Sequence, residues 1–377
     1  MKTILSMLLR VVMTLQYTIL KRCTRVDPCK IVFLGRHSDT IPRDFAMLKD
    51  ELESRHADVK IVVLTQRFEG GWRATLRFTP VLLRSVFHLA TAKVCMLDSY
   101  WPAVSLLNHR EELVVYQMWH SLGKMKKTGL QAVGKTQGRS RALASSLRMH
   151  EGYDYVVAGA PVWNEAYCEA FGVEEAQLLN IGLPRADYLI NSRESIAQRV
   201  LARYPELQSK PVIMYAPTFR RSSTPSPGAQ LLAEAIERDK FHLLIRSHKD
   251  DHLLLPEGEF FTCPDFTGPE LLTVADVLVT DYSSIALEGA LLDLPTYYFM
   301  YDYDQYMHES GTNIDPGKEM PRSVFREANK LAASLLGEYP TADLRRYKEK
   351  FVFPNPGSST KALVDHIYRE GGLCAIS

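Results

Sequence analysis

The sequence has few cysteines and no excess of charge of either sign. Its 377 residues include six cysteines without a CxxC pair: Cys23, Cys29, Cys95, Cys168, Cys263 and Cys374. This scatter argues for a reducing compartment and against a zinc site or a disulfide framework. Because 45 basic and 44 acidic side chains leave a formal net charge of +1, overall charge does not favour a nucleic-acid partner.

A hydrophobic run long enough to span a bilayer is also missing. The most apolar stretch, residues 5–20, is interrupted by Arg10 and is too short to cross. No small-residue cleavage site follows it, so no signal peptide is predicted. Basic residues punctuate the apolar ones at Lys2, Arg10, Lys21, Arg22 and Arg25. Residues 1–28 are therefore predicted to form an amphipathic helix that contacts an anionic membrane surface. The alternative is a helix packed on the protein's own surface.

The length of 377 residues predicts two domains. Buried strands are expected at 30–35, 59–64, 94–97, 113–119 and 153–158, with helices at 44–55, 81–90 and 161–171. The pattern breaks around 182–192, at Gly182 and Pro184. It resumes with strands at 212–216, 242–246, 277–279 and 296–299, and helices at 231–238 and 271–275.

Alternation of strands and helices is typical of α/β domains with a parallel sheet covered on both faces. We therefore expect two doubly wound, Rossmann-like domains facing across a cleft, residues 29–190 and 191–350, followed by a helical tail at 351–377. Clefts between domains are favoured ligand sites.

The stretch 275–299, ADVLVTDYSSIALEGALLDLPTYYF, reads as a strand, a polar turn, an apolar helix and a second strand. The turn lies at the carboxyl end of the first strand, where open α/β sheets bind their ligands. Ser283 or Ser284 can cap the helix and leave backbone N–H groups facing an anion. A capped helix start in an ordinary sheet is the alternative.

Other predicted strands also end in polar residues. His120 follows the strand at 113–119 and precedes a basic loop with Lys124, Lys126 and Lys127. An imidazole accepts a proton at neutral pH, and lysines can hold negative oxygens, although such a loop can equally be a solvated surface.

The second domain adds further polar strand ends. The run IRSHKD contains Arg246 and His248, and Thr218 and Arg220 follow the strand at 212–216. With the turn Asp281–Ser284 they predict an anion-binding rim that suits a nucleotide diphosphate. Asp302 and Asp304 are candidate metal ligands. Two carboxylates at this spacing are common, however, and no metal is predicted.

Four motifs carry a resemblance to a known family: WHSLGKMKKTG, YAPTFR, IRSHKD and ADVLVTDYSSIALEGALLDLP, between Trp119 and Pro295. In this order and spacing they resemble the CDP-glycerol glycerophosphotransferases of teichoic acid synthesis, in particular the single-module primases. The resemblance implies a GT-B fold, a peripheral location on the cytoplasmic face of the cell membrane, and no cofactor. The more common WHGTPLKK is WHSLGKMKK here, and Lys249 replaces the usual proline after the second histidine.

The resemblance implies that glycerol phosphate passes from CDP-glycerol to an undecaprenyl-diphosphate-linked disaccharide and that CMP leaves. His120 matches the general base and His248 the second essential histidine. The predicted substrate-binding residues are Lys126, Thr218, Arg220, Arg246, Asp281, Ser283, Ser284 and Glu288. No nucleic-acid partner is expected, and a homo-oligomer is left open.

Three alternatives remain at this stage. One is a transferase of ribitol phosphate or another polyol phosphate. The second is a GT-B glycosyltransferase or nucleotide-sugar 2-epimerase that uses UDP-sugars, and the third is a non-catalytic scaffold on a lipid surface.

Overall fold

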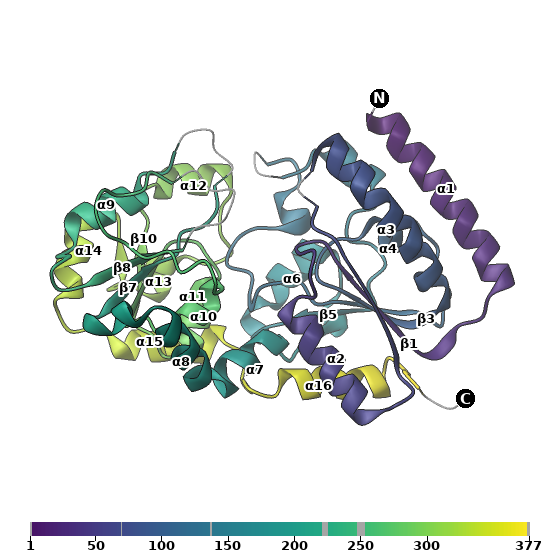
Figure 1. The fold of residues 1–377 in the computed structure, drawn as a ribbon. Coiled ribbons are helices and arrows are strands. Elements are labelled where there is room, and N and C mark those ends of the chain that lie inside the picture. Colours follow the sequence, from purple (N-terminus) through teal and green to yellow (C-terminus); the bar gives the residue numbers. More distant parts are fainter. Residues whose placement is uncertain (1, 69, 136–137, 221–224, 247–252, 375–377) are drawn as a thin grey trace.

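The fold consists of two parallel β-sheets, each covered by helices (Figure 1). The computed structural model describes residues 2–68, 70–135, 138–220, 225–246 and 253–374. The first sheet has the strand order β2-β1-β3-β4-β5-β6. Its strands are β1 (Asp27–Gly35), β2 (Lys60–Thr65), β3 (Ala92–Leu97), β4 (Val114–Gln117), β5 (Tyr155–Ala158) and β6 (Leu178–Asn180). Every residue from Lys30 to Gly35 is buried, as expected for a parallel strand covered on both faces.

The helices of the first domain cover both sides of this sheet. They are α2 (Arg43–Arg55), α3 (Gly71–Thr91), α4 (Pro102–Leu106), α5 (Arg141–Ser146), α6 (Asn164–Phe171) and α7 (Pro184–Asn191). Helix α2 lies on one side and α3 on the other (Figure 1). The C-terminal helix α16 (Ser359–Arg369) follows α15 (Thr341–Phe351) and packs on α2 and α7, so the end of the chain returns to the first domain.

The second sheet has the strand order β11-β10-β9-β7-β8. Its strands are β7 (Val212–Tyr215), β8 (His242–Ile245), β9 (Val277–Thr280), β10 (Thr296–Phe299) and β11 (Val324–Phe325). The remaining helices are α8 (Arg193–Arg203), α9 (Gly228–Ala235), α10 (Gly268–Leu271), α11 (Ile285–Leu291), α12 (Tyr303–Glu309), α13 (Pro316–Glu319) and α14 (Ala328–Leu335). The predicted βαβ unit is confirmed, because β10 pairs with β9 in parallel across α11.

Most of the predicted break at 182–192 is helical. Leu178–Asn180 forms the edge strand β6, and Pro184–Asn191 forms helix α7. Pro184 occupies the first turn of α7, where a missing N–H costs no hydrogen bond, so it starts this helix instead of interrupting the pattern. The two-domain fold is confirmed, and the exact boundaries, 29–190, 191–350 and 351–377, stay a proposal.

The N-terminal segment forms helix α1 (Lys2–Cys23), which packs along α3 (Figure 1). Met13 and Tyr17 are buried against the protein, whereas Val11 and Leu15 are 62% and 61% exposed. The helix therefore has an apolar face toward the protein and a second apolar face toward solvent. Within the described residues, no helix is long and apolar enough to cross a membrane.

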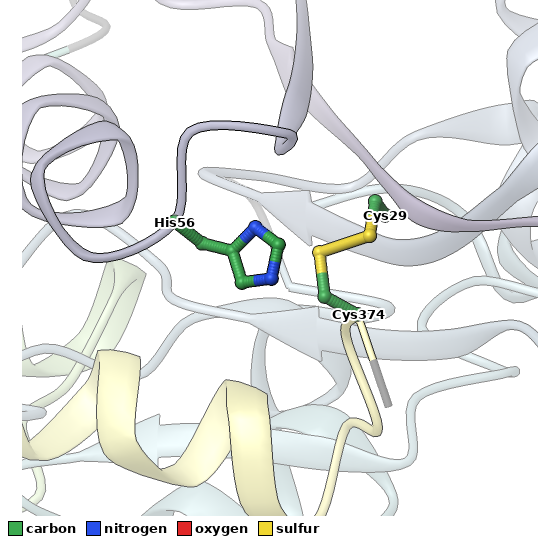
Figure 2. A group of neighbouring side chains, drawn as sticks. All are labelled: Cys29, His56 and Cys374. Atoms are coloured by element: carbon green, nitrogen blue, oxygen red, sulfur yellow. A yellow bond between two sulfur atoms is a disulfide. The ribbon is translucent and has the colours of Figure 1, made fainter. Parts of the chain in front are cut away.

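The structure pairs two of the cysteines. Cys29 in β1 and Cys374, which follows α16, form a disulfide (Figure 2). The sequence-based argument against disulfides is therefore wrong for this pair, which is separated by 345 residues and leaves no local spacing signal. Ligand atoms of Cys29, His56 and Cys374 lie within 4.8 Å of one another. Because the two sulfurs are bonded to each other, they are not available as thiolate ligands for a metal.

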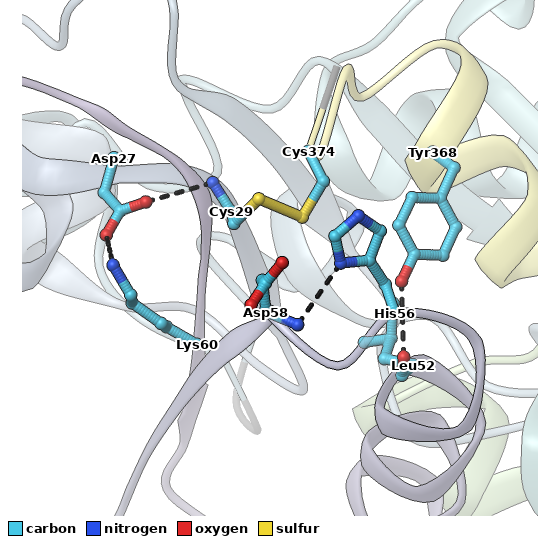
Figure 3. Close-up of a disulfide and its surroundings, with 8 residues drawn as sticks. All are labelled: Asp27, Cys29, Leu52, His56, Asp58, Lys60, Tyr368 and Cys374. Carbon is cyan, nitrogen blue, oxygen red and sulfur yellow. Dashed lines mark hydrogen bonds and ion pairs between the residues drawn. A yellow bond between two sulfur atoms is a disulfide. The ribbon is translucent and has the colours of Figure 1, made fainter. Parts of the chain in front are cut away.

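The disulfide joins the first part of β1 to the segment that follows α16. Nearby, the amide of Asp58 donates to Nδ1 of His56 at 3.3 Å, and the Tyr368 hydroxyl of α16 donates to the Leu52 carbonyl of α2 at 3.3 Å (Figure 3). Asp27 accepts the amide of Cys29 and pairs with Lys60. The bridge thus reinforces the packing of α16 on α2.

Reducing this disulfide should destabilise the folded protein. Cys374→Ser, or a reductant acting on the unmodified chain, is expected to lower the free energy of unfolding by about 2–4 kcal/mol, because the cross-link constrains the unfolded chain. Denaturant titration with and without dithiothreitol measures the effect. The control is Cys23→Ser, which removes an exposed free thiol and should behave like the unmodified chain. A reductant that leaves the unfolding midpoint of the unmodified chain unchanged would contradict the expectation.

Candidate active site

A cavity of about 670 Å³ is lined by residues of both domains. The first domain contributes Arg36, Tyr100 and parts of the loop that follows β4, namely residues 119–120 and 126–129. The second domain contributes the loop after β7, with Thr218 and Arg220, and residues 301–310 around α12. Both loops leave the carboxyl ends of parallel strands, where α/β sheets bind their ligands.

His120 lies in this cavity with one ring nitrogen fixed. Its Nδ1 donates a hydrogen bond to the backbone carbonyl of Asp98 at 3.3 Å, which leaves Nε2 as the nitrogen with a free lone pair. Its ring packs against those of His37 and Trp119, with centroids 4.4 and 4.2 Å away. Burial, together with the charge of His37, holds the pKa of His120 well below its usual value. The imidazole is therefore neutral at pH 7 and can accept a proton.

The three lysines of the β4 loop have different surroundings. Lys126 and Lys127 line the cavity. Lys124 is buried away from it, where its Nζ donates to Thr128 Oγ1 at 2.7 Å and lies over the rings of Trp119 and Phe171. Desolvation lowers the pKa of Lys124 far below its usual value. Lys124 thus supports the loop, and Lys126 and Lys127 are the two that can meet an anion.

A buried carboxylate organises the second-domain wall. Asp281 accepts the amide of Thr218 at 2.8 Å and pairs with Arg220 at 2.9 Å. Arg220 also donates two hydrogen bonds to Asp302, at 2.6 and 3.0 Å. These carboxylates raise the pKa of Arg220 and compensate its charge. Arg220 and Asp281 therefore shape the wall, while Thr218, whose buried Oγ1 has no partner within the described residues, offers a hydroxyl to the cavity.

Asp302 and Asp304 bind different arginines. Asp302 holds Arg220, whereas Asp304 pairs with Arg326 at 3.0 Å on the surface. The two carboxylates do not converge on one point, so the metal-site alternative for this pair has no geometric support.

The predicted donor-binding residues Arg246, Ser283 and Ser284 follow strands β8 and β9 and lie outside the cavity lining. Ser284 is the N-cap of α11, but its side chain does not bond the helix, and Ser283 Oγ accepts the amide of Ile285 at 3.4 Å. Arg246 ends β8, and its side chain passes Gly268 at the start of α10. Their contacts with a donor stay predictions.

Glu288 and His248 are the remaining predicted residues. Glu288 is buried in α11, where desolvation raises its pKa to about 7 against the lowering effect of Arg185. Among the described residues Glu288 is not part of the cavity lining, and its role as a substrate contact stays a prediction. His248 lies outside the described residues.

Several residues in the cavity lining or bonded to it were missed from the sequence. Arg36 follows β1, and Asp98 follows β3, so the strand-end argument that selected His120 could have found both. Arg139 and His150 lie in irregular segments between β4 and β5, where no periodicity indicates which side chains turn inward.

The fold is GT-B-like, and comparison with solved structures agrees. The wall teichoic acid polymerase TagF superimposes with a TM-score of 0.73 at 21% identity, covering 98% of this chain and 96% of that one. A UDP-GlcNAc 2-epimerase of Methanocaldococcus jannaschii gives a TM-score of 0.51 at 12% identity, covering 92% and 99% of the two chains. These likenesses confirm the fold.

The family model for CDP-glycerol:poly(glycerophosphate) glycerophosphotransferase matches residues 16–369, and the chain belongs to this family of transferases of teichoic acid biosynthesis. The teichoic acid ribitol-phosphate primase of Bacillus spizizenii is 27% identical, covering 97% of this chain and 98% of the relative. The teichoic acid glycerol-phosphate primase of Bacillus subtilis is 25% identical, with 76% of each chain covered. The family resemblance of the four motifs is thereby confirmed.

Proposed function

We propose that this chain transfers glycerol phosphate from CDP-glycerol to a hydroxyl of an undecaprenyl-diphosphate-linked disaccharide. The observation that carries the proposal is that His120 lines one cavity with Lys126, Lys127 and Thr218. A base and a set of phosphate-binding groups in one cleft suit phosphoryl transfer, which depends on positioning and charge stabilisation.

In the proposed reaction, Nε2 of His120 takes the proton of the acceptor hydroxyl, and the hydroxyl oxygen attacks the β-phosphorus of the donor. The bond between that phosphorus and the bridging oxygen breaks, and CMP leaves with this oxygen. Lys126, Lys127 and the Thr218 hydroxyl are placed to hold the phosphate oxygens. From the family resemblance, His248, Arg246, Ser283 and Ser284 are assigned to the donor phosphates as well.

CDP-ribitol is the second candidate donor. The ribitol-phosphate primase aligns over 98% of its own length, whereas the glycerol-phosphate primase of Bacillus subtilis aligns over 76%. Overall similarity at this level supports both polyols, and CDP-glycerol is retained because the family description names glycerophosphate.

A transfer assay tests the function directly. Purified protein is mixed with CDP-glycerol, CDP-ribitol or UDP-GlcNAc and a prenyl-diphosphate disaccharide, and CMP or UDP release is followed together with product mass. CMP release that requires the acceptor supports the proposal, and the CDP-polyol that reacts identifies the donor. Turnover of UDP-GlcNAc alone would instead favour the glycosyltransferase or epimerase alternative.

In the same assay, His120→Gln should lower kcat by about 10²- to 10⁴-fold, because general-base assistance is lost, while donor affinity changes little. The unmodified enzyme should lose activity on acidification only below pH 6.5, since protonation of a histidine with a lowered pKa begins at lower pH. That acid limb should disappear in His120→Gln. A loss of less than tenfold would exclude His120 as the base.

The lysines of the β4 loop provide a matched pair of variants. Lys126→Met should weaken CDP-glycerol binding by about tenfold or more, because a charge-assisted hydrogen bond contributes roughly 1.5–3 kcal/mol. Lys124→Met, in the aromatic surroundings described above, should leave donor affinity unchanged and the protein folded. Isothermal titration calorimetry of both variants measures the difference. Equal losses in the two variants would contradict the assignment of Lys126.

We further propose that α1 holds the protein at the cytoplasmic face of the membrane. Its outward face exposes Val11, Val12, Leu15 and Ile19, next to the basic residues Arg10 and Arg22. Trp72 and Leu76 of the neighbouring helix α3 are 66% and 58% exposed and extend the apolar surface. Apolar area combined with positive charge is typical of interfacial helices.

The double variant Leu15→Glu, Ile19→Glu should release the protein from anionic vesicles, because each buried leucine or isoleucine contributes about 1.5–3 kcal/mol. The substitutions leave the buried face of α1, with Met13 and Tyr17, unchanged, so the variant should keep the fold and donor binding. Leu336→Glu, at a residue 53% exposed in the second domain, is the control and should still sediment with vesicles. Unchanged sedimentation of the double variant would refute the role of α1.

A further inference from the structure

Reduction of the disulfide between Cys29 and Cys374 would place two thiols beside an imidazole, that of His56 (Figure 2). Ligand atoms of these three residues lie within 4.8 Å of one another, and all three side chains are partly buried. Among the described residues, no other three histidine, cysteine, aspartate or glutamate side chains meet at this spacing. The three residues therefore form a candidate metal site that opens only when the bridge is reduced.

Contacts other than the bridge hold the three residues together. The amide of Cys374 donates to the carbonyl of Pro28, one residue before the other cysteine, at 2.7 Å. The amide of His56, which follows α2, donates to the Leu52 carbonyl at 3.1 Å. The His56 ring packs on that of Tyr368 in α16, with centroids 6.4 Å apart. Because none of these contacts involves a sulfur atom, reduction leaves the two thiols and the imidazole near one point.

Two thiolates and an imidazole form a ligand set that suits zinc. Zn²⁺ binds thiolate sulfur at about 2.3 Å and imidazole nitrogen at about 2.0–2.1 Å, so one ion can join ligand atoms that are about 4 Å apart. Magnesium and calcium prefer oxygen ligands. Because the three side chains are only partly buried, water can complete the tetrahedral coordination of the ion.

These ligands lie far from the cavity. Cys29 is near the start of β1, whereas Arg36, which lines the cavity, directly follows the end of this strand. At about 3.3 Å per residue, the strand separates the two positions by roughly 20 Å. The ligands instead come from three segments of the first domain: β1, the end of α2 and the segment after α16. An ion bound to them would stabilise the fold and take no part in the transfer reaction.

We propose that the reduced chain binds one Zn²⁺ ion through Cys29, His56 and Cys374. The ion replaces the disulfide as the cross-link between the C-terminal segment, β1 and α2. Thiols persist in a reducing compartment, so the ion retains the connection where the disulfide is lost. The proposal concerns the stability of the first domain and is independent of the transfer function.

Zinc binding follows a two-electron reduction. A dithiol reductant attacks one sulfur of the bridge, the S–S bond breaks, and the reductant leaves as a disulfide, while Cys29 and Cys374 gain two electrons and two protons. Zn²⁺ then forms two Zn–S bonds, and the two thiol protons are released. Zinc affinity should therefore fall at low pH, where the thiols and the imidazole hold their protons.

Cobalt titration of the reduced, full-length chain tests the site. The protein is reduced with a water-soluble phosphine, because dithiols bind zinc themselves, and a thiol reagent in denaturant checks that all six cysteines are reduced. We expect one Co²⁺ ion per chain, with the near-ultraviolet absorption of cobalt–thiolate bonds. Zn²⁺ should abolish this absorption and Mg²⁺ should not. The oxidised chain should show none of it.

Substitutions identify the ligands. Cys29→Ser and Cys374→Ser should each lose most of the thiolate absorption. His56→Gln keeps both thiols and should weaken Co²⁺ binding about 10- to 100-fold or more, since even a residue that only supports a metal ligand contributes that much. Cys168→Ser is the matched control, because Cys168 is also a partly buried thiol but lies outside the group. This variant should bind Co²⁺ like the unmodified chain.

Denaturant unfolding of the reduced chain gives a second readout. Zn²⁺ should raise the unfolding midpoint of the reduced chain toward that of the oxidised chain, because an ion that binds only the folded state stabilises it. The midpoint of reduced Cys374→Ser should not respond to Zn²⁺. Absence of thiolate absorption in the reduced chain would overturn the proposal. Absorption that survives both cysteine substitutions, or a Co²⁺ affinity that His56→Gln leaves unchanged, would overturn it as well.

Discussion

One buried aspartate at the end of a strand organises each wall of the cavity. Asp98 follows β3 and fixes the Arg36 amide and the His120 ring, which belong to the ends of β1 and β4. Asp281 follows β9 and fixes the Thr218 amide and Arg220 at the end of β7. Both aspartates are less than 10% exposed. Because neighbouring parallel strands end at one edge of a sheet, a single aspartate there can orient two loops at once.

The charge of the cavity differs between its two walls. On the second-domain wall, the charge of Arg220 is compensated by ion pairs with Asp281 and Asp302, and these pairs hold the wall together. On the first-domain wall, Arg36, Arg139 and Lys126 form no ion pair with the described residues, and burial lowers the pKa of both Arg36 and Lys126 against the opposing charges of Asp98 and Asp281. Charges that the fold leaves uncompensated in a low-dielectric cleft interact strongly with an anionic ligand. The first-domain wall therefore carries the cations that are not ion-paired within the described residues.

The sequence predicts the fold and part of the site for a clear physical reason. Buried parallel strands read as continuous apolar runs, so β1, β4, β7 and β9 and the polar residues at their ends are visible, including His120, Thr218 and Asp281. Side-chain direction in irregular loops has no periodicity. The sequence therefore does not show that Lys126 lines the cavity whereas Lys124 is buried away from it. Pro184 was interpreted as an interruption of the pattern, but proline is also common in the first turn of a helix, which is its place in α7. The Cys29–Cys374 bridge depends on tertiary packing alone.

The loop that carries the base also depends on the second domain. Asn313 donates from Nδ2 to the carbonyls of Lys124 and Lys126, at 2.7 and 3.3 Å, and Lys135 donates to the Ser310 carbonyl at 3.2 Å. The Tyr347 hydroxyl of α15 contacts the sulfur of Met125 at 3.3 Å. These bonds join the segments that follow β4 to segments beyond β10, so separating the domains would break them together. The position of Lys126 is thus coupled to the contact between the two domains.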